Sequence, residues 1–122
     1  MEINSIINEI LHIPERFNAL GNNKSVYSLL KQTGYFEKRE EVSESLIKVA
    51  LGQHSGYMDL WLRWSADKRS SSGWFCNPND HQKYVVAYSS LEKGVIERME
   101  YNDIISACAA FIKREIESIA QS

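Results

Sequence analysis

Residues Tyr57–Phe75, YMDLWLRWSADKRSSSGWF, decide the predicted fold of this chain. Over the first eight positions two sets of residues alternate: Met58, Leu60, Leu62 and Trp64 form one set, and Tyr57, Asp59, Trp61 and Arg63 form the other. A period of two is typical of a strand with one buried face. We therefore predict a strand over residues 57–64, with Trp64 on its core face and Trp61 on the opposite face.

The segments that follow predict three more strands separated by turns. Residues 70–73 and 77–80 are rich in serine, glycine, asparagine and proline, which favour turns, and a short strand over 74–76 lies between them. The run YVVAY at 84–88 is apolar at successive positions, as expected of a central strand, and a last strand covers 95–101. Short connections between consecutive strands predict a four-stranded antiparallel β-meander.

The segments on either side of these strands have the periodicity of helices. N-terminal helices are predicted from residue 3 to about residue 52, with Ser25 and Ser43 as caps and a break at Pro14. A long C-terminal helix begins after Asn102, its predicted cap, and its apolar stripe includes Cys108 and Phe111. Because helices before and after a sheet must cover one of its faces, the chain is expected to form a single α+β domain over residues 1–122.

Composition bounds the class of protein. Of the 122 residues, 43% are hydrophobic and 25% are charged, which is ordinary for a soluble globular domain. The net charge of -2 argues against direct nucleic-acid binding, and no apolar run approaches the roughly 20 residues of a membrane span. The N-terminus lacks the basic region of a secretory signal and the chain has two cysteines, so we expect a cytoplasmic protein with reduced thiols.

Five residues are candidates for binding a partner. Trp61 shares its predicted strand face with Asp59 and Arg63, so it is either covered by another element or exposed as an anchor. Trp74 faces the same choice. Arg69 is either solvated or held so that its guanidinium binds a carboxylate or phosphate of a ligand.

Four residues after the first predicted strand are candidates for shaping a turn. Asp67 can accept hydrogen bonds from the backbone or from the serines that include Ser71 and Ser72, and Gly73 closes the run. The alternative is that Asp67 fixes Arg69. A phosphate-binding loop would need more glycine and a helix after it, whereas a strand is predicted to follow.

Cys76 and His81 flank a predicted turn and raise the question of a catalytic thiol or a metal site. A nucleophilic cysteine requires a base or a positive field nearby, and a structural zinc site requires four ligands. The other cysteine, Cys108, lies on the apolar stripe of the last predicted helix. We therefore predict no catalytic residue, no metal site and no cofactor.

The signature Ser65-x-Asp67-Lys68-Arg69-x-Ser71-Ser72-Gly73-Trp74, with the later segments 84–88 and 107–112, resembles a family of small bacterial proteins that includes immunity proteins of toxin systems such as contact-dependent growth inhibition. The resemblance covers about residues 34–119. Phe75 stands where the family pattern has tyrosine. The resemblance implies a non-enzymatic protein that binds the C-terminal domain of a cognate toxin, which could be a nuclease, and blocks it.

The sequence therefore predicts a monomeric or weakly dimeric immunity protein that neutralises a toxin by direct binding. The acidic residues at 37–44, or those at 92–100, could face a basic toxin. One alternative is a regulatory module in which Arg69 and Trp74 hold a small anionic ligand. A second is a small hydrolase that uses Cys76 and His81.

Overall fold

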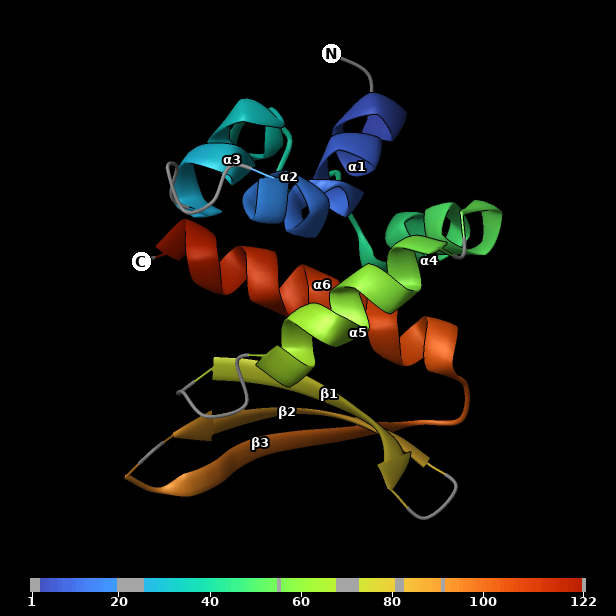
Figure 1. The fold of residues 1–122 in the computed structure, drawn as a ribbon, viewed down its shortest axis with the longest axis vertical. Helices are drawn as coiled ribbons and strands as arrows, with labels where there is room; N and C mark the ends of the chain where they lie inside the picture. The colour runs from blue at the N-terminus through green and yellow to red at the C-terminus, as the bar shows by residue number, and fades with distance from the viewer. Residues whose placement is uncertain are drawn as a thin grey trace.

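The C-terminal helix α6 (Ile104–Gln121) lies between a group of helices and a β-sheet (Figure 1). This computed structural model describes residues 3–19, 26–54, 56–67, 73–80, 83–90 and 92–121. The chain forms α1 (Ile3–Leu11), α2 (Ile13–Ala19), α3 (Val26–Gln32), a 3-10 turn (Tyr35–Glu37), α4 (Glu44–Gln53), α5 (Gly56–Asp67) and then the strands β1 (Gly73–Asp80), β2 (Lys83–Ser90) and β3 (Gly94–Tyr101). The predicted α+β class is confirmed.

The predicted strand over residues 57–64 is wrong, because these residues belong to helix α5. Apolar side chains are so dense in this segment that they satisfy a period of two and a period of 3.6 equally well. The exposed positions decide between the two periods: Gly56, Asp59, Arg63 and Ala66 follow one another at spacings of three, four and three. That spacing places them on one side of a helix, while Trp61 and Ser65 are buried on the other.

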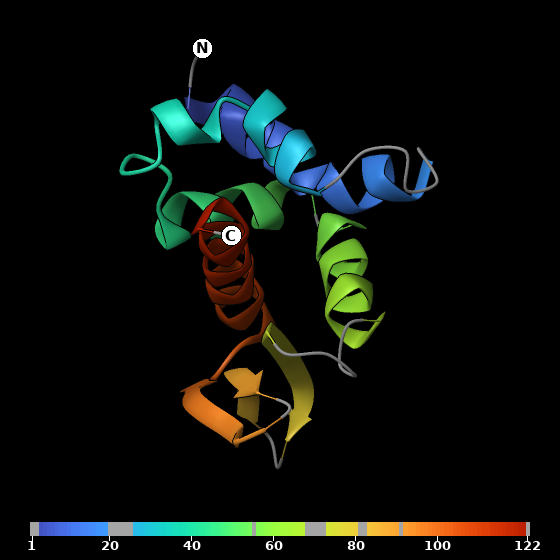
Figure 2. The same ribbon diagram turned by 90° about the vertical axis from the view of Figure 1, so that its left-hand side faces the viewer.

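The sheet has three antiparallel strands in the order β1-β2-β3, instead of the four predicted (Figure 2). The prediction of a central strand at 84–88 is confirmed, since β2 pairs with both neighbours and buries Val85, Val86 and Ala87. Strand β1 continues through residues 77–80, where a turn was predicted. Pro78 is compatible with this continuation because β1 is an edge strand and its pairing with β2 shifts register between Asn77 and Asp80, a place where sheets tolerate proline.

Polar side chains mark the starts of two helices. Ser43 caps α4 as predicted, and its Oγ accepts a hydrogen bond from the backbone N–H of Leu46 over 3.2 Å. The predicted cap of α6, Asn102, is wrong by one residue. Asp103 accepts the backbone N–H of Ser106 over 2.7 Å and its hydroxyl over 2.9 Å, and these bonds lower the pKa of the Asp103 carboxyl.

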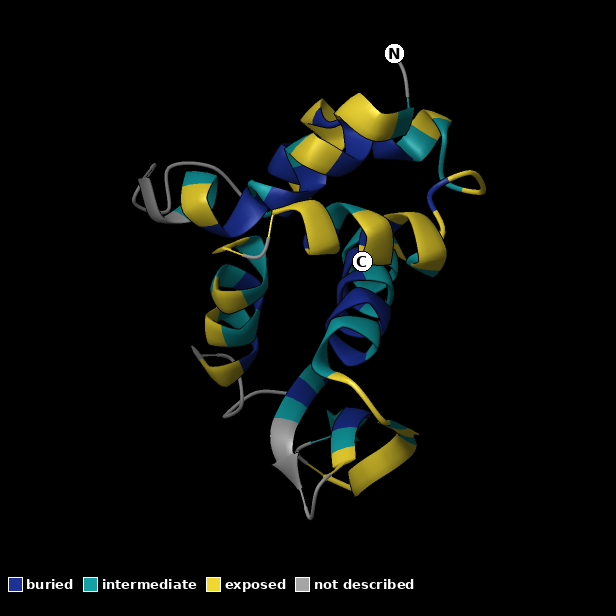
Figure 3. Cartoon of the chain, turned by 90° about the vertical axis from the view of Figure 1, so that its right-hand side faces the viewer, coloured by how far each residue is buried: buried dark blue, intermediate teal, exposed yellow. Residues whose placement is uncertain are grey.

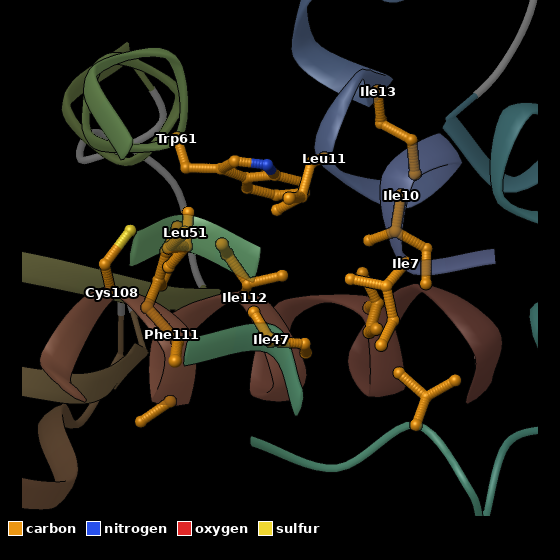
Figure 4. Close-up of a cluster of buried hydrophobic side chains, with 14 of the residues drawn as sticks. Ile7, Ile10, Leu11, Ile13, Ile47, Leu51, Trp61, Cys108, Phe111 and Ile112 are labelled. Carbon is orange, nitrogen blue, oxygen red and sulfur yellow. The ribbon is translucent and has the colours of Figure 1, made fainter. Parts of the chain in front are cut away.

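The core lies mainly where α6 meets α1, α4 and α5 (Figure 4). Phe111 and Ile112 of α6 are fully buried, and Trp61 extends from α5 toward Leu11 of α1. The face of the sheet that points toward α6 contributes Trp74, Cys76 and Val86 to the same cluster. The described buried residues of this cluster are Ile6, Ile7, Ile10, Leu11, Ile13, Leu29, Leu30, Tyr35, Val42, Ile47, Leu51, Trp61, Trp74, Cys76, Val86, Ala107, Cys108, Ala109, Ala110, Phe111, Ile112 and Ile116. One continuous core therefore joins the helices to the sheet.

The two edges of the sheet differ in their surroundings. Helix α5 packs against β1, and the buried hydroxyl of Ser65 bonds to the backbone of Cys76 there. Strand β3 is exposed over most of its length, and Val95 and Ile96 keep 56% and 53% of their surface in solvent (Figure 3). The β3 edge is consequently the open side of the described sheet.

Candidate functional site

The structure places Trp61 inside the core, with no exposed surface. Its ring packs against Phe111 with 6.3 Å between the ring centroids, at an interplanar angle of 75°. The prediction that Trp61 shares a face with Asp59 and Arg63 is wrong, because residues two apart on a helix point in different directions. Trp61 therefore offers no surface on which a partner could bind.

Trp64 is partly buried and has a specific polar contact. Its indole N–H donates a hydrogen bond to Oε2 of Glu115 over 2.8 Å, and its ring lies edge-on to Phe17. Glu115 is 2% exposed, so this indole supplies a donor to a carboxylate that water barely reaches. Trp64 packs against the core as predicted, but it also joins α5 to α6 through a hydrogen bond that the sequence pattern did not show.

The remaining predicted residues fall into three groups. Asp59 and Arg63 are exposed on α5. Arg69, Ser71 and Ser72 lie outside the described residues, as does the side chain of Asp67, whose backbone ends α5. Gly73 begins β1 with a φ of 145°, a backbone conformation that favours glycine.

A groove of about 700 Å³ lies between α6 and the sheet. Its lining comes from five elements, namely β1 (Trp74), β2 (Tyr88), β3 (Ile96, Glu97), α4 (Glu44) and α6 (Lys113, Arg114, Glu117, Ser118, Gln121). Sheet register explains the arrangement on the strand side, because Trp74 pairs with Tyr88 and Tyr88 pairs with Glu97. Of the predicted partner-binding residues that the structure describes, Trp74 is the one that lines this groove.

Arg114 and Trp74 form one wall of the groove. The guanidinium carbon of Arg114 lies 5.3 Å from the centroid of the Trp74 ring, and Tyr88 packs edge-on against the same ring at 5.4 Å. A guanidinium over an indole face is held by a cation–π interaction. Nη2 of Arg114 donates to the sulfur of Met99 over 3.4 Å, and its buried Nε has no acceptor among the described residues.

A network of charged groups forms the neighbouring wall. Arg39 binds both carboxylate oxygens of Glu117, with Nε 3.0 Å from each and Nη2 2.7 Å from Oε2. The hydroxyl of Tyr35 donates to the same carboxylate. Lys113 completes the network through Glu117 at 3.3 Å, the Tyr35 hydroxyl at 2.8 Å and the carbonyl of Arg39 at 3.1 Å. The charges of Lys113 and Glu117 are therefore already compensated.

The same network perturbs the ionisation of its members. Hydrogen bonds from Arg39 are the largest cause that lowers the pKa of Glu117, to about 2 from an ordinary 4.5. Burial raises the pKa of Tyr35, and the negative charge of Glu117 raises it further. Arg39, which belongs to the charged run at 37–41, is therefore held against α6 by Glu117.

Two carboxylates in the groove are in a different situation. Glu44, in the first turn of α4, and Glu97, on β3, have no ion-pair or hydrogen-bond partner among the described residues. Glu44 and Glu97 come from the two acidic segments, 37–44 and 92–100, that were predicted as alternative surfaces for a basic partner. The fold brings one residue of each segment to the same groove.

Both thiols lie in the hydrophobic core. Cys76 is 5% exposed and Cys108 is fully buried. Burial raises the pKa of Cys76 to about 11, and it also raises the pKa of Cys108, so the thiolate form is suppressed at neutral pH. His81 lies outside the described residues.

The described ranges contain no group of three or more His, Cys, Asp or Glu side chains that could hold a metal ion. Within the same ranges, no helix has both the length and the apolar character needed to cross a membrane.

The sequence pattern missed Arg114, Lys113 and Tyr88 as groove residues. One signal was available for Arg114. It is a charged residue between Phe111 and Ile116 of the apolar stripe, so its stem must cross the margin of the buried face. The partnership of Arg114 with Trp74 could not be found, because it depends on how α6 lies across the sheet.

No protein-family model, curated protein or solved structure matches this chain.

Proposed function

We propose that this protein is an immunity protein that binds the C-terminal domain of a cognate toxin in the cytoplasm and neutralises it. One observation carries the proposal: the groove holds the rings of Trp74 and Tyr88 together with two carboxylates, Glu44 and Glu97, that have no cationic partner among the described residues. The resemblance of the segment from Ser65 to Trp74 to immunity proteins points in the same direction.

This combination of groups suits the recognition of a protein. Aromatic side chains are enriched at the centres of protein interfaces, where they supply contact area at a low cost in entropy. Unpaired carboxylates at the margin attract a basic partner and speed its association. Toxins that cleave nucleic acids are commonly basic, so a nuclease domain would meet complementary charge at Glu44 and Glu97.

Neutralisation by binding requires no chemistry from this chain. The bound protein would cover the active site of the toxin or the path by which its substrate enters. The burial of Cys76 and its raised pKa favour such a binder over the alternative of a small hydrolase.

The direct test is co-expression with the toxin domain encoded beside this protein. Cells that express both should grow, cells that express the toxin alone should not, and the two purified chains should elute together from a size-exclusion column. Growth arrest in the presence of this protein, with separate elution of the two chains, would contradict the proposal.

A further inference from the structure

On the basis of the proposed function, we infer that the groove recognises a mixed-charge segment of the toxin, in which an acidic side chain pairs with Arg114 and a basic side chain pairs with Glu97. The two contacts would lie at opposite sides of the aromatic pair Trp74 and Tyr88. The inference gives the toxin segment a pattern of one negative and one positive charge, whereas Glu44 and Glu97 alone would call only for a positive charge.

Arg114 has donors to spare for a carboxylate. A guanidinium carries five N–H groups, and the acceptor that the structure records for Arg114 is the thioether sulfur of Met99, which accepts weakly. Because Arg114 lines the groove, a carboxylate that entered beside this guanidinium would gain strong, charge-assisted hydrogen bonds from its remaining N–H groups.

The neighbouring cation, Lys113, does not compete for that role. Its ammonium group already binds Glu117, the Tyr35 hydroxyl and the carbonyl of Arg39. Glu117, in turn, is held by both Arg39 and Lys113. Among the described groove residues, Arg114 is thus the cation without a carboxylate, and its orientation is fixed by the ring of Trp74.

Glu97 lies across the sheet from this cation. Trp74, Tyr88 and Glu97 are successive partners on β1, β2 and β3, so two strand spacings, about 10 Å, separate the backbone of Trp74 from that of Glu97. The ammonium and carboxylate of a free amino acid are one carbon atom apart and cannot span this separation. A protein segment with opposite charges on different residues can span it.

The sign of the charges excludes simpler occupants. A wholly basic segment would satisfy Glu97 and Glu44 but would meet Arg114 with repulsion, and a wholly acidic segment would have the reverse difficulty. A segment that carries both charges neutralises Arg114 on one wall of the groove and Glu97 on the other. Its aliphatic or aromatic side chains would lie against Tyr88 and the exposed Ile96.

The test compares four single variants in their affinity for the toxin domain, measured by isothermal titration calorimetry. Arg114→Gln and Glu97→Gln remove one groove charge each, and both should weaken binding by about tenfold or more. Lys31→Gln and Glu15→Gln are matched controls, because they remove a positive and a negative charge from exposed positions outside the groove, and they should stay within about twofold of the wild type.

A fifth variant and a melting curve separate recognition from stability. Arg114→Lys keeps the positive charge but loses the planar fork, so its affinity should fall between those of the wild type and Arg114→Gln. If Arg114→Gln lowers the melting temperature, Glu97→Gln still decides between the two explanations, because Glu97 is exposed and has no partner among the described residues. The ratio of the Glu97→Gln affinity to the Glu15→Gln affinity is then the readout.

The outcomes separate the inference from the proposed function. Wild-type protein that protects cells while Arg114→Gln and Glu97→Gln bind as tightly as the controls would overturn the inference and leave the immunity function standing. Tight binding of free glutamate or inorganic phosphate that Arg114→Gln abolishes, without any loss of toxin affinity, would assign Arg114 to a small anion and overturn it too. Wild-type protein that neither binds nor protects would overturn both.

Discussion

The hydroxyl of Ser65 accepts a hydrogen bond from the backbone N–H of Cys76 over 2.7 Å and donates one to the backbone carbonyl of the same residue over 3.3 Å. Both residues are buried. Cys76 lies on β1, which has a strand on one side only, so its outward backbone groups would otherwise lack partners. The serine of helix α5 thus takes the place of a further strand at that edge.

Replacing Ser65 with alanine should destabilise the fold by about 1–3 kcal/mol, because two buried backbone groups of Cys76 lose their partner. Urea unfolding followed by tryptophan fluorescence measures this change. Ser45→Ala, at an exposed position of α4, is the control and should change the free energy of unfolding by less than about 0.5 kcal/mol. Equal stabilities of the two variants would show that Ser65 is dispensable.

The hydrogen bond from Trp64 to Glu115 should also be measurable. Trp64→Phe keeps an aromatic ring but removes the N–H donor from a carboxylate that is 2% exposed, with an expected cost of about 1–3 kcal/mol. A double-mutant cycle with Glu115→Gln isolates the pairwise energy, which should be about 0.5–3 kcal/mol. Strictly additive effects of the two substitutions would argue against a direct interaction in solution.

The fold was predictable from the sequence wherever one periodicity dominates. The central strand around Val85 and the cap at Ser43 follow from local patterns, and the structure has both. The prediction for residues 57–64 failed because their apolar positions fit a strand and a helix equally well. The exposed residues Asp59 and Arg63, four positions apart, indicated the helix. That single error placed Trp61 on one face with Asp59 and Arg63, whereas the structure buries it on the opposite side of α5.

The candidate site was predictable to a smaller extent. Trp74 could be singled out because a large aromatic residue beside a turn is unusual, and it does line the groove. Arg114, Glu44 and Glu97 come from three distant parts of the chain, and each is unremarkable in its own segment. Their association depends on the packing of α6 against β1 and α4, which no local pattern specifies.

Acid should weaken the link between Glu117 and Arg39. The folded-state pKa of Glu117, about 2, lies below its ordinary value of 4.5, so the ionised carboxylate stabilises the fold above pH 4.5. This contribution is lost as the pH falls from 4.5 toward 2. We therefore expect the difference in unfolding free energy between wild type and Glu117→Gln to be constant near neutrality and to shrink below pH 4.5.

Urea unfolding at a series of pH values checks this expectation. Arg39→Gln is the control, because it removes the largest cause of the lowered pKa and should flatten the acid dependence. Parallel pH profiles for the wild type and both variants would mean that the pair does not form in solution.

The buried thiols should react slowly in the folded protein. Because burial raises the pKa of Cys76 to about 11, few molecules carry its thiolate at pH 7, and alkylation should be much slower than that of a small free thiol. Both cysteines should react readily after unfolding in denaturant. Fast, stoichiometric alkylation of Cys76 in the native state would instead revive the hydrolase alternative.

The central position of α6 has a consequence for how the chain folds during its synthesis. This helix packs against α3, α4, α5 and all three strands, yet residues 104–121 are translated after every one of them. The earlier segments consequently leave the ribosome with their apolar faces uncovered, and the shared core closes only when α6 emerges. Folding of this domain is therefore expected to be completed only after α6 has left the ribosome, with a window before that in which chaperones hold the unfinished domain.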